Sequence, residues 1–128
     1  MNGFKKNGIL LLLLLTTIFT FSSCEEDYWF IDGEWRIVEI STYKGECPYY
    51  YGDIMIFYPD GEFYVQGDYG FYENGYWDVK GHYLYVDFNG DGYEDIRADI
   101  RQGDSDYMVL DINDYSYRSR YTLRMVRL

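Results

Sequence analysis

One hairpin pattern constrains the fold more than any other part of the sequence. In residues 76–88, apolar and polar side chains alternate on both sides of a Lys-Gly-His turn at 80–82. The apolar members of the pattern are Trp77, Val79, Leu84, Val86 and Phe88. Because successive side chains of a β-strand point to opposite faces, the alternation predicts two antiparallel strands with one buried face and one solvent face.

Similar segments occupy most of the chain on either side of this hairpin. They are residues 34–42, 49–58, 62–66, 96–101, 108–112 and 117–128. Pro59-Asp60-Gly61 separates two of them as a tight turn, and Glu73-Asn74-Gly75 carries a second hairpin signal. After Cys24, no window of eleven residues has a helical period, and glycine recurs too often for helices.

The number and spacing of these segments predict an all-β fold. About eight strands follow one another at intervals of roughly 8–12 residues, which is typical of a sandwich or a barrel. An antiparallel up-and-down barrel leaves no open sheet edge and so protects the chain from edge-to-edge aggregation. We therefore expect such a barrel, of about eight strands, over residues 33–128.

Several motifs resemble the lipocalin-like domains of Bacteroidetes lipoproteins. Gly33-Glu34-Trp35 matches the Gly-x-Trp of lipocalins at the start of the first strand. The segment from Gly75 to Val86 matches a Gly-x-Trp-x-Val-x-Gly-x-x-Leu-x-Val pattern, with Pro59-Asp60-Gly61-Glu62-Phe63 upstream of it. Residues 121–126 resemble the family's final strand. The resemblance implies a small antiparallel barrel whose floor is closed by Trp35.

The resemblance also implies an apolar cup that holds a small molecule in some members of the family. The lining would combine the floor tryptophan with the apolar face of the hairpin: Trp35, Trp77, Val79, Leu84, Val86 and Phe88. This domain is shorter than a typical ligand-carrying lipocalin and rich in aromatic residues. An interior filled by its own side chains is therefore the alternative.

The first 23 residues have the organisation of an export signal. Met1–Lys6 is basic, and the apolar run 9–21 is too short for a membrane-spanning helix, which needs roughly 20 residues. Phe21-Ser22-Ser23-Cys24 resembles the bacterial lipobox. That resemblance implies cleavage before Cys24, a diacylglyceryl group on its thiol and an acyl chain such as palmitate on its new amino terminus. The alternative is an ordinary signal peptide with an incidental cysteine.

The segment 24–32 reads as an acidic tether to the barrel domain. Glu25-Glu26-Asp27 resembles the surface-export signal of Bacteroidetes lipoproteins. It implies that the domain lies on the outer face of the outer membrane. The alternative is a plain solvated linker on a lipoprotein that faces the periplasm.

Charge excludes one large class of partner. Without residues 1–23, 105 of the 128 residues remain, which suits one domain. The leader contains two lysines and no acids, so its removal changes the net charge from −11 to −13. Such a surface repels phosphate, and nucleic-acid binding is therefore not expected.

No group of residues in the sequence points to a catalytic centre. His82, the sole histidine, falls on a predicted turn, and nothing supplies the nucleophile and orienting group of a triad. If Cys24 carries lipid, Cys47 has no disulfide partner. Cys47 lies in a predicted loop without a basic neighbour to lower its pKa, so a structural role is favoured over a reactive one. We expect a protein that is not an enzyme and has no resident cofactor.

One loop has the oxygen spacing of a calcium site. Its ligands would be Asp87, Asn89, Asp91, the carbonyl of Tyr93, and Asp95. Ala98 stands where a calcium loop has its bidentate glutamate. A hairpin turn explains the same residues without a metal ion.

Tyrosines offer a second route to binding. The chain has 17, among them Tyr49, Tyr50, Tyr51, Tyr69 and Tyr72 in or near loops, and Tyr83 and Tyr85 on an outward strand face. Exposed aromatic rings stack on sugars or pack on protein partners, whereas cross-strand pairs merely stiffen a sheet.

These features lead to two functional hypotheses. In the first, a lipid-anchored cell-envelope protein carries a small apolar ligand inside its barrel. In the second, it is a surface interaction module whose exposed tyrosines contact a glycan or a protein partner.

Overall fold

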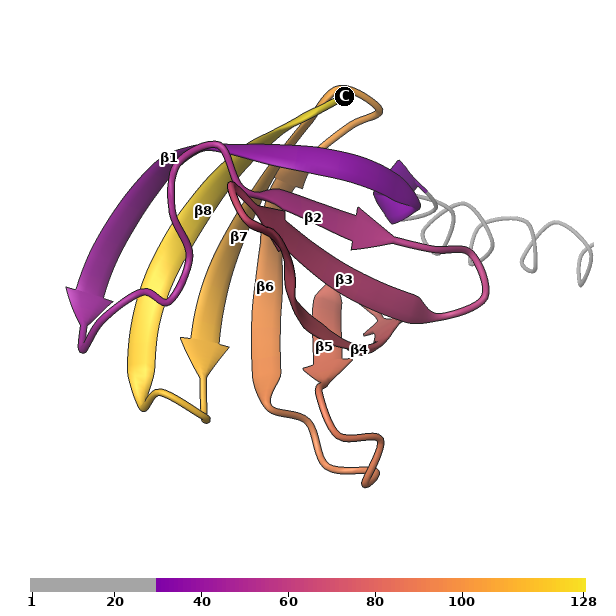
Figure 1. Cartoon of the computed structure of the whole chain (residues 1–128), viewed down its shortest axis with the longest axis vertical. Helices are drawn as coiled ribbons and strands as arrows, with labels where there is room; N and C mark the ends of the chain where they lie inside the picture. The colour runs from indigo at the N-terminus through magenta and orange to yellow at the C-terminus, as the bar shows by residue number, and fades with distance from the viewer. Residues whose placement is uncertain (1–29) are drawn as a thin grey trace, which may run out of the picture.

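Eight antiparallel strands close into one barrel in the computed structural model, which describes residues 30–128 (Figure 1). The strands are β1 Gly33–Lys44, β2 Ile54–Phe57, β3 Glu62–Gly67, β4 Gly70–Lys80, β5 Tyr83–Asp87, β6 Ile96–Gly103, β7 Tyr107–Asp114 and β8 Ser119–Arg127. Each strand pairs with its neighbour in sequence, and β8 pairs with β1. The predicted up-and-down barrel is confirmed. The leader, Cys24 and the tether as far as residue 29 lie outside the described residues.

Alternation along the strands builds the core, as the sequence predicts. In β1, Trp35 and Ile37 are buried while Glu34 and Arg36 are exposed, and β5 buries Leu84 and Val86. The other buried hydrophobic side chains of the main cluster include Phe57, Phe63, Val65, Ile96, Ala98, Met108, Leu110, Ile112, Tyr121, Leu123 and Met125. They come from every strand except β4, whose inward residues are only half-buried.

The second predicted strand is shorter than expected. Residues 49–53 form a turn, and β2 begins only at Ile54. The Asp53 carboxylate accepts the backbone N–H of Tyr50 at 3.1 Å, and Gly52 adopts a φ of 86°. An aspartate that bonds the backbone of its own turn competes with strand pairing, and the β-branched and aromatic composition of the segment does not reveal this.

The prediction of a hairpin turn at Glu73-Asn74-Gly75 is wrong. These residues continue through the middle of β4, and the chain instead reverses at residues 68–69, between β3 and β4. Gly75 is needed for a different reason, since a Cβ there would lie 2.5 Å from the carbonyl oxygen of Asp87. The glycine marks a close backbone approach within the sheet rather than a turn.

The two ends of the barrel are built differently. At one end, here called the floor end, the chain enters at Phe30 and turns tightly at 58–61, 81–82 and 104–106. The opposite end, here called the loop end, carries the connections 45–53, 68–69, 88–95 and 115–118. Figure 1 shows the β5–β6 and β7–β8 connections side by side at the lower edge of the barrel.

The floor is closed by stacked apolar and cationic groups. The indole N–H of Trp35 donates to the carbonyl of Ile31 at 2.8 Å, and the ring packs edge-on against Phe30. Above the same ring lies the Arg127 guanidinium, 4.4 Å from its centroid, which also donates to the carbonyl of Asp32 at 2.7 Å. The completely buried Trp35 therefore lies where the resemblance implies.

Candidate functional site

The predicted ligand-lining residues form part of a packed core. Trp35, Leu84 and Val86 are buried. The other three, Trp77, Val79 and Phe88, are half-buried and pack against the same cluster. Trp77, for example, stacks edge-on on Phe57 at 5.5 Å and donates its indole N–H to the carbonyl of Tyr58. The interior is thus occupied by the chain's own side chains, the alternative that the size of the domain raised.

Toward the loop end the apolar core gives way to a layer of paired acids and tyrosines, here called the acid–tyrosine layer. Each of three tyrosine hydroxyls donates to one carboxylate. The pairs are Tyr49 with Glu73 at 2.6 Å, Tyr121 with Asp114 at 2.7 Å, and Tyr72 with Asp53. Buried polar groups must be hydrogen-bonded to be tolerated, and these pairs satisfy one another.

Burial changes the acidity of this layer. Desolvation raises the pKa of Glu73 above its ordinary value, although the Tyr49 hydroxyl partly offsets the change. Desolvation also raises the pKa of Tyr121 and of Tyr72, and the neighbouring carboxylates Asp114 and Asp53 raise them further. The hydroxyls therefore stay protonated at neutral pH and remain donors.

This layer borders a groove lined by five aromatic side chains, and the pair of Tyr72 and Asp53 belongs to both. The five are Tyr50, Tyr51, Tyr69, Phe71 and Tyr72, and the lining is completed by Asp53, Gly67, Asp68 and Gly70. We call this the aromatic groove. Its volume is about 500 Å³. All five rings belong to exposed residues, and Tyr69 at the β3–β4 turn is fully exposed. Exposed aromatic residues that gather on one surface are a candidate for an interaction site.

Irregularities in the backbone create the groove. In the pairing of β3 with β4, Val65 lies opposite Glu73 and Gln66 opposite Phe71, so Tyr72 is the extra residue of a β-bulge. A bulge re-aims a side chain, and here the Tyr72 hydroxyl reaches Asp53 on the facing loop. Gly67 makes room for the ring, because a Cβ there would lie 3.0 Å from it.

Aromatic contacts continue from the groove along the outside of β3. Tyr64 stacks against Phe71 at 5.6 Å on one side and edge-on against Tyr58 at 5.6 Å on the other. These three residues, with Asp60 and Glu62, line a second hollow of about 420 Å³. The aromatic surface therefore extends from the loop end toward the floor end.

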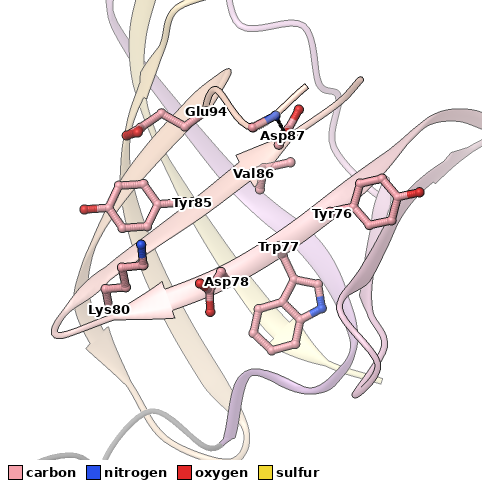
Figure 2. A pocket seen from close by; sticks show the side chains of 9 residues that line it. Tyr76, Trp77, Asp78, Lys80, Tyr85, Val86, Asp87 and Glu94 are labelled. Carbon is pink, nitrogen blue, oxygen red and sulfur yellow. Dashed lines mark hydrogen bonds between the residues drawn. The ribbon is translucent and has the colours of Figure 1, made fainter. Parts of the chain in front are cut away.

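A third groove lies between β4, β5 and the β5–β6 loop (Figure 2). Its volume is about 380 Å³, and it has a mixed lining that includes Tyr76, Asp78, Lys80, Tyr85 and Glu94. The ammonium group of Lys80 lies 6.0 Å from the centre of the Tyr85 ring, toward which Figure 2 shows it directed. Both predicted outward tyrosines, Tyr83 and Tyr85, have such local partners; the Arg97 guanidinium lies 5.2 Å from the Tyr83 ring.

The predicted calcium loop is held by backbone hydrogen bonds. The Asp87 carboxylate accepts the N–H groups of Asn89, Gly90 and Gly92 at 2.9–3.1 Å. Desolvation would raise the pKa of Asp87, but these N–H groups outweigh it and lower the pKa. In the same way Asp91 accepts from the N–H of Tyr93, and Asp95 from that of Phe88. Within residues 30–128, no three His, Cys, Asp or Glu side chains gather in a way that could hold a metal ion. The hairpin turn accounts for these contacts, and calcium binding stays an untested alternative.

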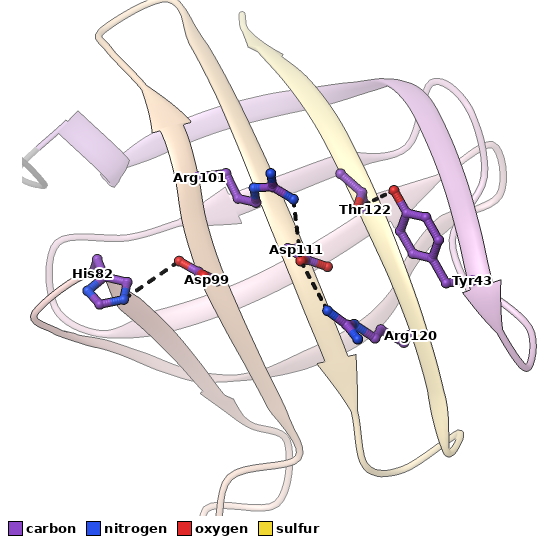
Figure 3. Close-up of polar contacts among 7 residues, drawn as sticks. All are labelled: Tyr43, His82, Asp99, Arg101, Asp111, Arg120 and Thr122. Atoms are coloured by element: carbon purple, nitrogen blue, oxygen red, sulfur yellow. Dashed lines mark hydrogen bonds and ion pairs between the residues drawn. The ribbon is translucent and has the colours of Figure 1, made fainter.

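Cys47 and His82, the two remaining candidates for a reactive side chain, lie at opposite ends of the barrel. Cys47 is a free, half-buried cysteine whose thiol lies 3.7 Å from the carbonyl of Tyr49, and burial raises the pKa of the thiol. A raised pKa disfavours the reactive thiolate. His82 is exposed at the β4–β5 turn, 3.8 Å from Asp99 (Figure 3).

Comparison with known proteins assigns no family: no family model and no curated protein matches the chain. Within the described residues, no helix has the length and apolarity required to cross a bilayer.

Part of the site was visible in the sequence. Tyr50, Tyr51, Tyr69 and Tyr72 were expected near loops, and the structure gathers them in one groove. The sequence predicts the same position for Tyr49, but Tyr49 is buried and its hydroxyl donates to Glu73. The sequence does not single out Phe71, because its exposure results from the bulge at Tyr72, for which there is no local sequence signal.

Proposed function

We propose that this domain is a non-enzymatic binding module of the cell envelope, and that its aromatic groove binds a neutral glycan. The observation that carries the proposal is the gathering of five exposed aromatic rings over one hollow of about 500 Å³. A surface of this kind is costly to leave in water unless it meets a partner.

The chemistry of the lining favours sugar. The C–H faces of a pyranose ring pack on aromatic faces, and its hydroxyls donate to carboxylate or phenol oxygens. The lining includes four tyrosines and the exposed residue Asp68, and among its described residues there is no lysine or arginine. A phosphate-bearing or sulfate-bearing ligand would meet acidic side chains here, in a chain that is already strongly negative.

The barrel interior gives less support to the alternative function, carriage of a small apolar ligand. Carriage of a small apolar molecule needs an apolar cavity with a mouth, commonly of about 300 Å³ or more. The side chains nominated for that lining instead pack on one another, and the four hollows described here are all lined in part by exposed residues.

Lipid anchoring at Cys24 would present the groove at a membrane surface, on the outer face if Glu25-Glu26-Asp27 directs export. Two or more acyl chains hold a protein stably where a single chain does not. Cys24→Ala should therefore move the protein from the membrane to the soluble fraction. Retention of the variant in membranes after an alkaline wash would refute the anchor while leaving the groove untouched.

A glycan array probed with residues 24–128 tests the binding proposal. We expect the wild type to bind a set of neutral oligosaccharides, and the double variant Tyr50→Ala/Tyr69→Ala to lose that binding. The matched control is Tyr93→Ala/Tyr117→Ala, which removes two exposed tyrosines outside the groove. Equal loss in both variants, or no binding by the wild type, would refute the proposal.

A further inference from the structure

A cluster of cationic side chains lies at the β7–β8 connection of this strongly acidic protein. It surrounds a groove of about 370 Å³ lined by Lys44, Asn113, Asp114, Tyr115, Arg118, Ser119 and Arg120. Only nine of the residues from 24 onward are Lys or Arg, and three of them meet here. We call this hollow the cationic groove. It is distinct from the aromatic groove, with which it shares no lining residue.

Strand register forces the like charges together. Lys44 on β1 lies directly opposite Arg120 on β8, and Arg120 in turn lies opposite Asn113 on β7. Like charges that face each other across a strand pair destabilise the sheet. Gly45, which follows Lys44, lies against the β7–β8 turn, since a Cβ there would be 3.1 Å from the Arg118 carbonyl oxygen. Arg118 belongs to this turn and lines the groove together with Lys44 and Arg120.

Few of these positive charges are neutralised by the protein. Within residues 30–128, the side chains of Lys44 and Arg118 make no ion pair or hydrogen bond. Arg120 has only a long contact of 3.5 Å with Asp111, a carboxylate that it shares with Arg101 at 3.6 Å (Figure 3). The Asp114 carboxylate at the groove is already occupied by the N–H of Tyr117 and the hydroxyl of Tyr121.

Two further features point to a ligand. Ser119, which is one of the residues that line the groove, is 5% exposed, and its buried hydroxyl has no hydrogen-bond partner among the described residues. Arg118 adopts a φ of 51°, and no other non-glycine residue in 30–128 has a positive φ. An unsatisfied buried hydroxyl and a strained backbone both cost stability, and such costs concentrate at binding sites.

From these observations we infer that the cationic groove is a binding site for an oxyanion: a carboxylate, sulfate or phosphate group. Two guanidinium groups and one ammonium group match such an anion in charge, and guanidinium forks bind two of its oxygens at once. The Asn113 amide supplies a neutral donor. A bound anion would relieve the repulsion between Lys44 and Arg120.

The test is an NMR titration of residues 24–128 with sodium sulfate and, separately, sodium glucuronate, each against sodium chloride of equal ionic strength. We expect saturable shifts of the backbone amides of residues 113–120. Saturation by sulfate at the lower concentration would identify a free inorganic anion as the source, and saturation by glucuronate at the lower concentration the acidic group of a sugar. Absence of saturable shifts with both anions would overturn the inference.

Substitutions distinguish a specific anion site from a general effect of positive charge. Arg118→Gly suits the positive φ, so the fold is retained, and we expect anion affinity to fall about tenfold with the loss of one charge-assisted bond. Lys44→Gln should weaken binding in the same direction. The control is Arg36→Gln, which removes an exposed charge elsewhere on β1. An equal loss of affinity in Arg36→Gln and Arg118→Gly would also overturn the inference.

Discussion

The floor end of this barrel is closed by apolar side chains, whereas the loop end is polar and carries exposed grooves. The floor end seals the core with Phe30, Ile31 and Trp35, capped by the Arg127 guanidinium. The loop end has a polar acid–tyrosine layer, with exposed aromatic and cationic grooves outside it. We therefore propose that the floor end mainly stabilises the fold and that the loop end carries the binding surface. Substitutions of similar residues at the two ends should therefore have different consequences.

The largest expected effect is at the floor. Trp35→Ala should lower the free energy of unfolding by about 3–5 kcal/mol, because it leaves a cavity beneath Arg127 and removes the bond to Ile31. Urea denaturation measures the change.

Tyr69→Ala is the matched loop-end control for the floor variant. The ring of Tyr69 is fully exposed, so its removal should change the free energy of unfolding by no more than about 0.5 kcal/mol. Similar losses in the two variants would contradict the division between the ends.

The acid–tyrosine layer should give an intermediate effect. Tyr121→Phe keeps the ring but leaves buried Asp114 without its hydroxyl donor, which should cost about 1–3 kcal/mol. Tyr117→Phe, at an exposed tyrosine beside the same aspartate, should cost nothing measurable. If the two variants unfold at the same urea concentration, the Tyr121–Asp114 bond contributes no more to the free energy of unfolding than an exposed tyrosine hydroxyl does.

The acid–tyrosine layer should also make the free energy of unfolding depend on pH. Folding raises the pKa of Glu73 above its ordinary value of 4.5, so the folded state binds that proton more tightly than the unfolded state. The resulting stabilisation is complete below about pH 4.5 and is lost as the pH rises through the folded pKa. Relative to wild type, Glu73→Gln should therefore gain stability over this window. A difference between the two proteins that does not change with pH would show that Glu73 titrates normally.

The smallest expected effect concerns the Asp87 loop. Its carboxylates already accept backbone N–H groups, so we expect millimolar Ca²⁺ to leave the thermal midpoint unchanged, and Asp87→Asn to lower it slightly without Ca²⁺. A rise of the wild-type midpoint with Ca²⁺ that Asp87→Asn abolishes would instead support the calcium site that the spacing suggests.

The sequence was a good guide wherever structure is local and periodic. Alternation around residues 80–82 identified the hairpin β4–β5 and its inward face, and repetition of that pattern identified the barrel. It failed at residues 49–53 and at Gly75, where a side-chain bond to the backbone and a close approach of another strand decide the conformation. The contact at Gly75 joins two different strands, and the contact at residues 49–53 is a side-chain bond within a turn. Neither contact appears in the alternation of apolar and polar residues.

The candidate sites were harder to foresee for the same reason. Tyr50 and Tyr69 are separated by two strands, and only closure of the barrel brings them to one groove. The cationic groove depends on the register that places Lys44 opposite Arg120, 76 positions later in the chain. Neither register nor the bulge at Tyr72 follows from the apolar pattern alone, so composition could suggest a binding surface but not locate it.

The central claim is that recognition lies in the aromatic groove at the loop end. Calorimetric titration with a neutral oligosaccharide selected on the array should show that Tyr69→Ala weakens binding about fivefold or more, as expected for the loss of one stacked ring. Tyr93→Ala, which removes an exposed ring outside the groove, should bind like the wild type. Equal affinities of Tyr69→Ala and the wild type would contradict the claim.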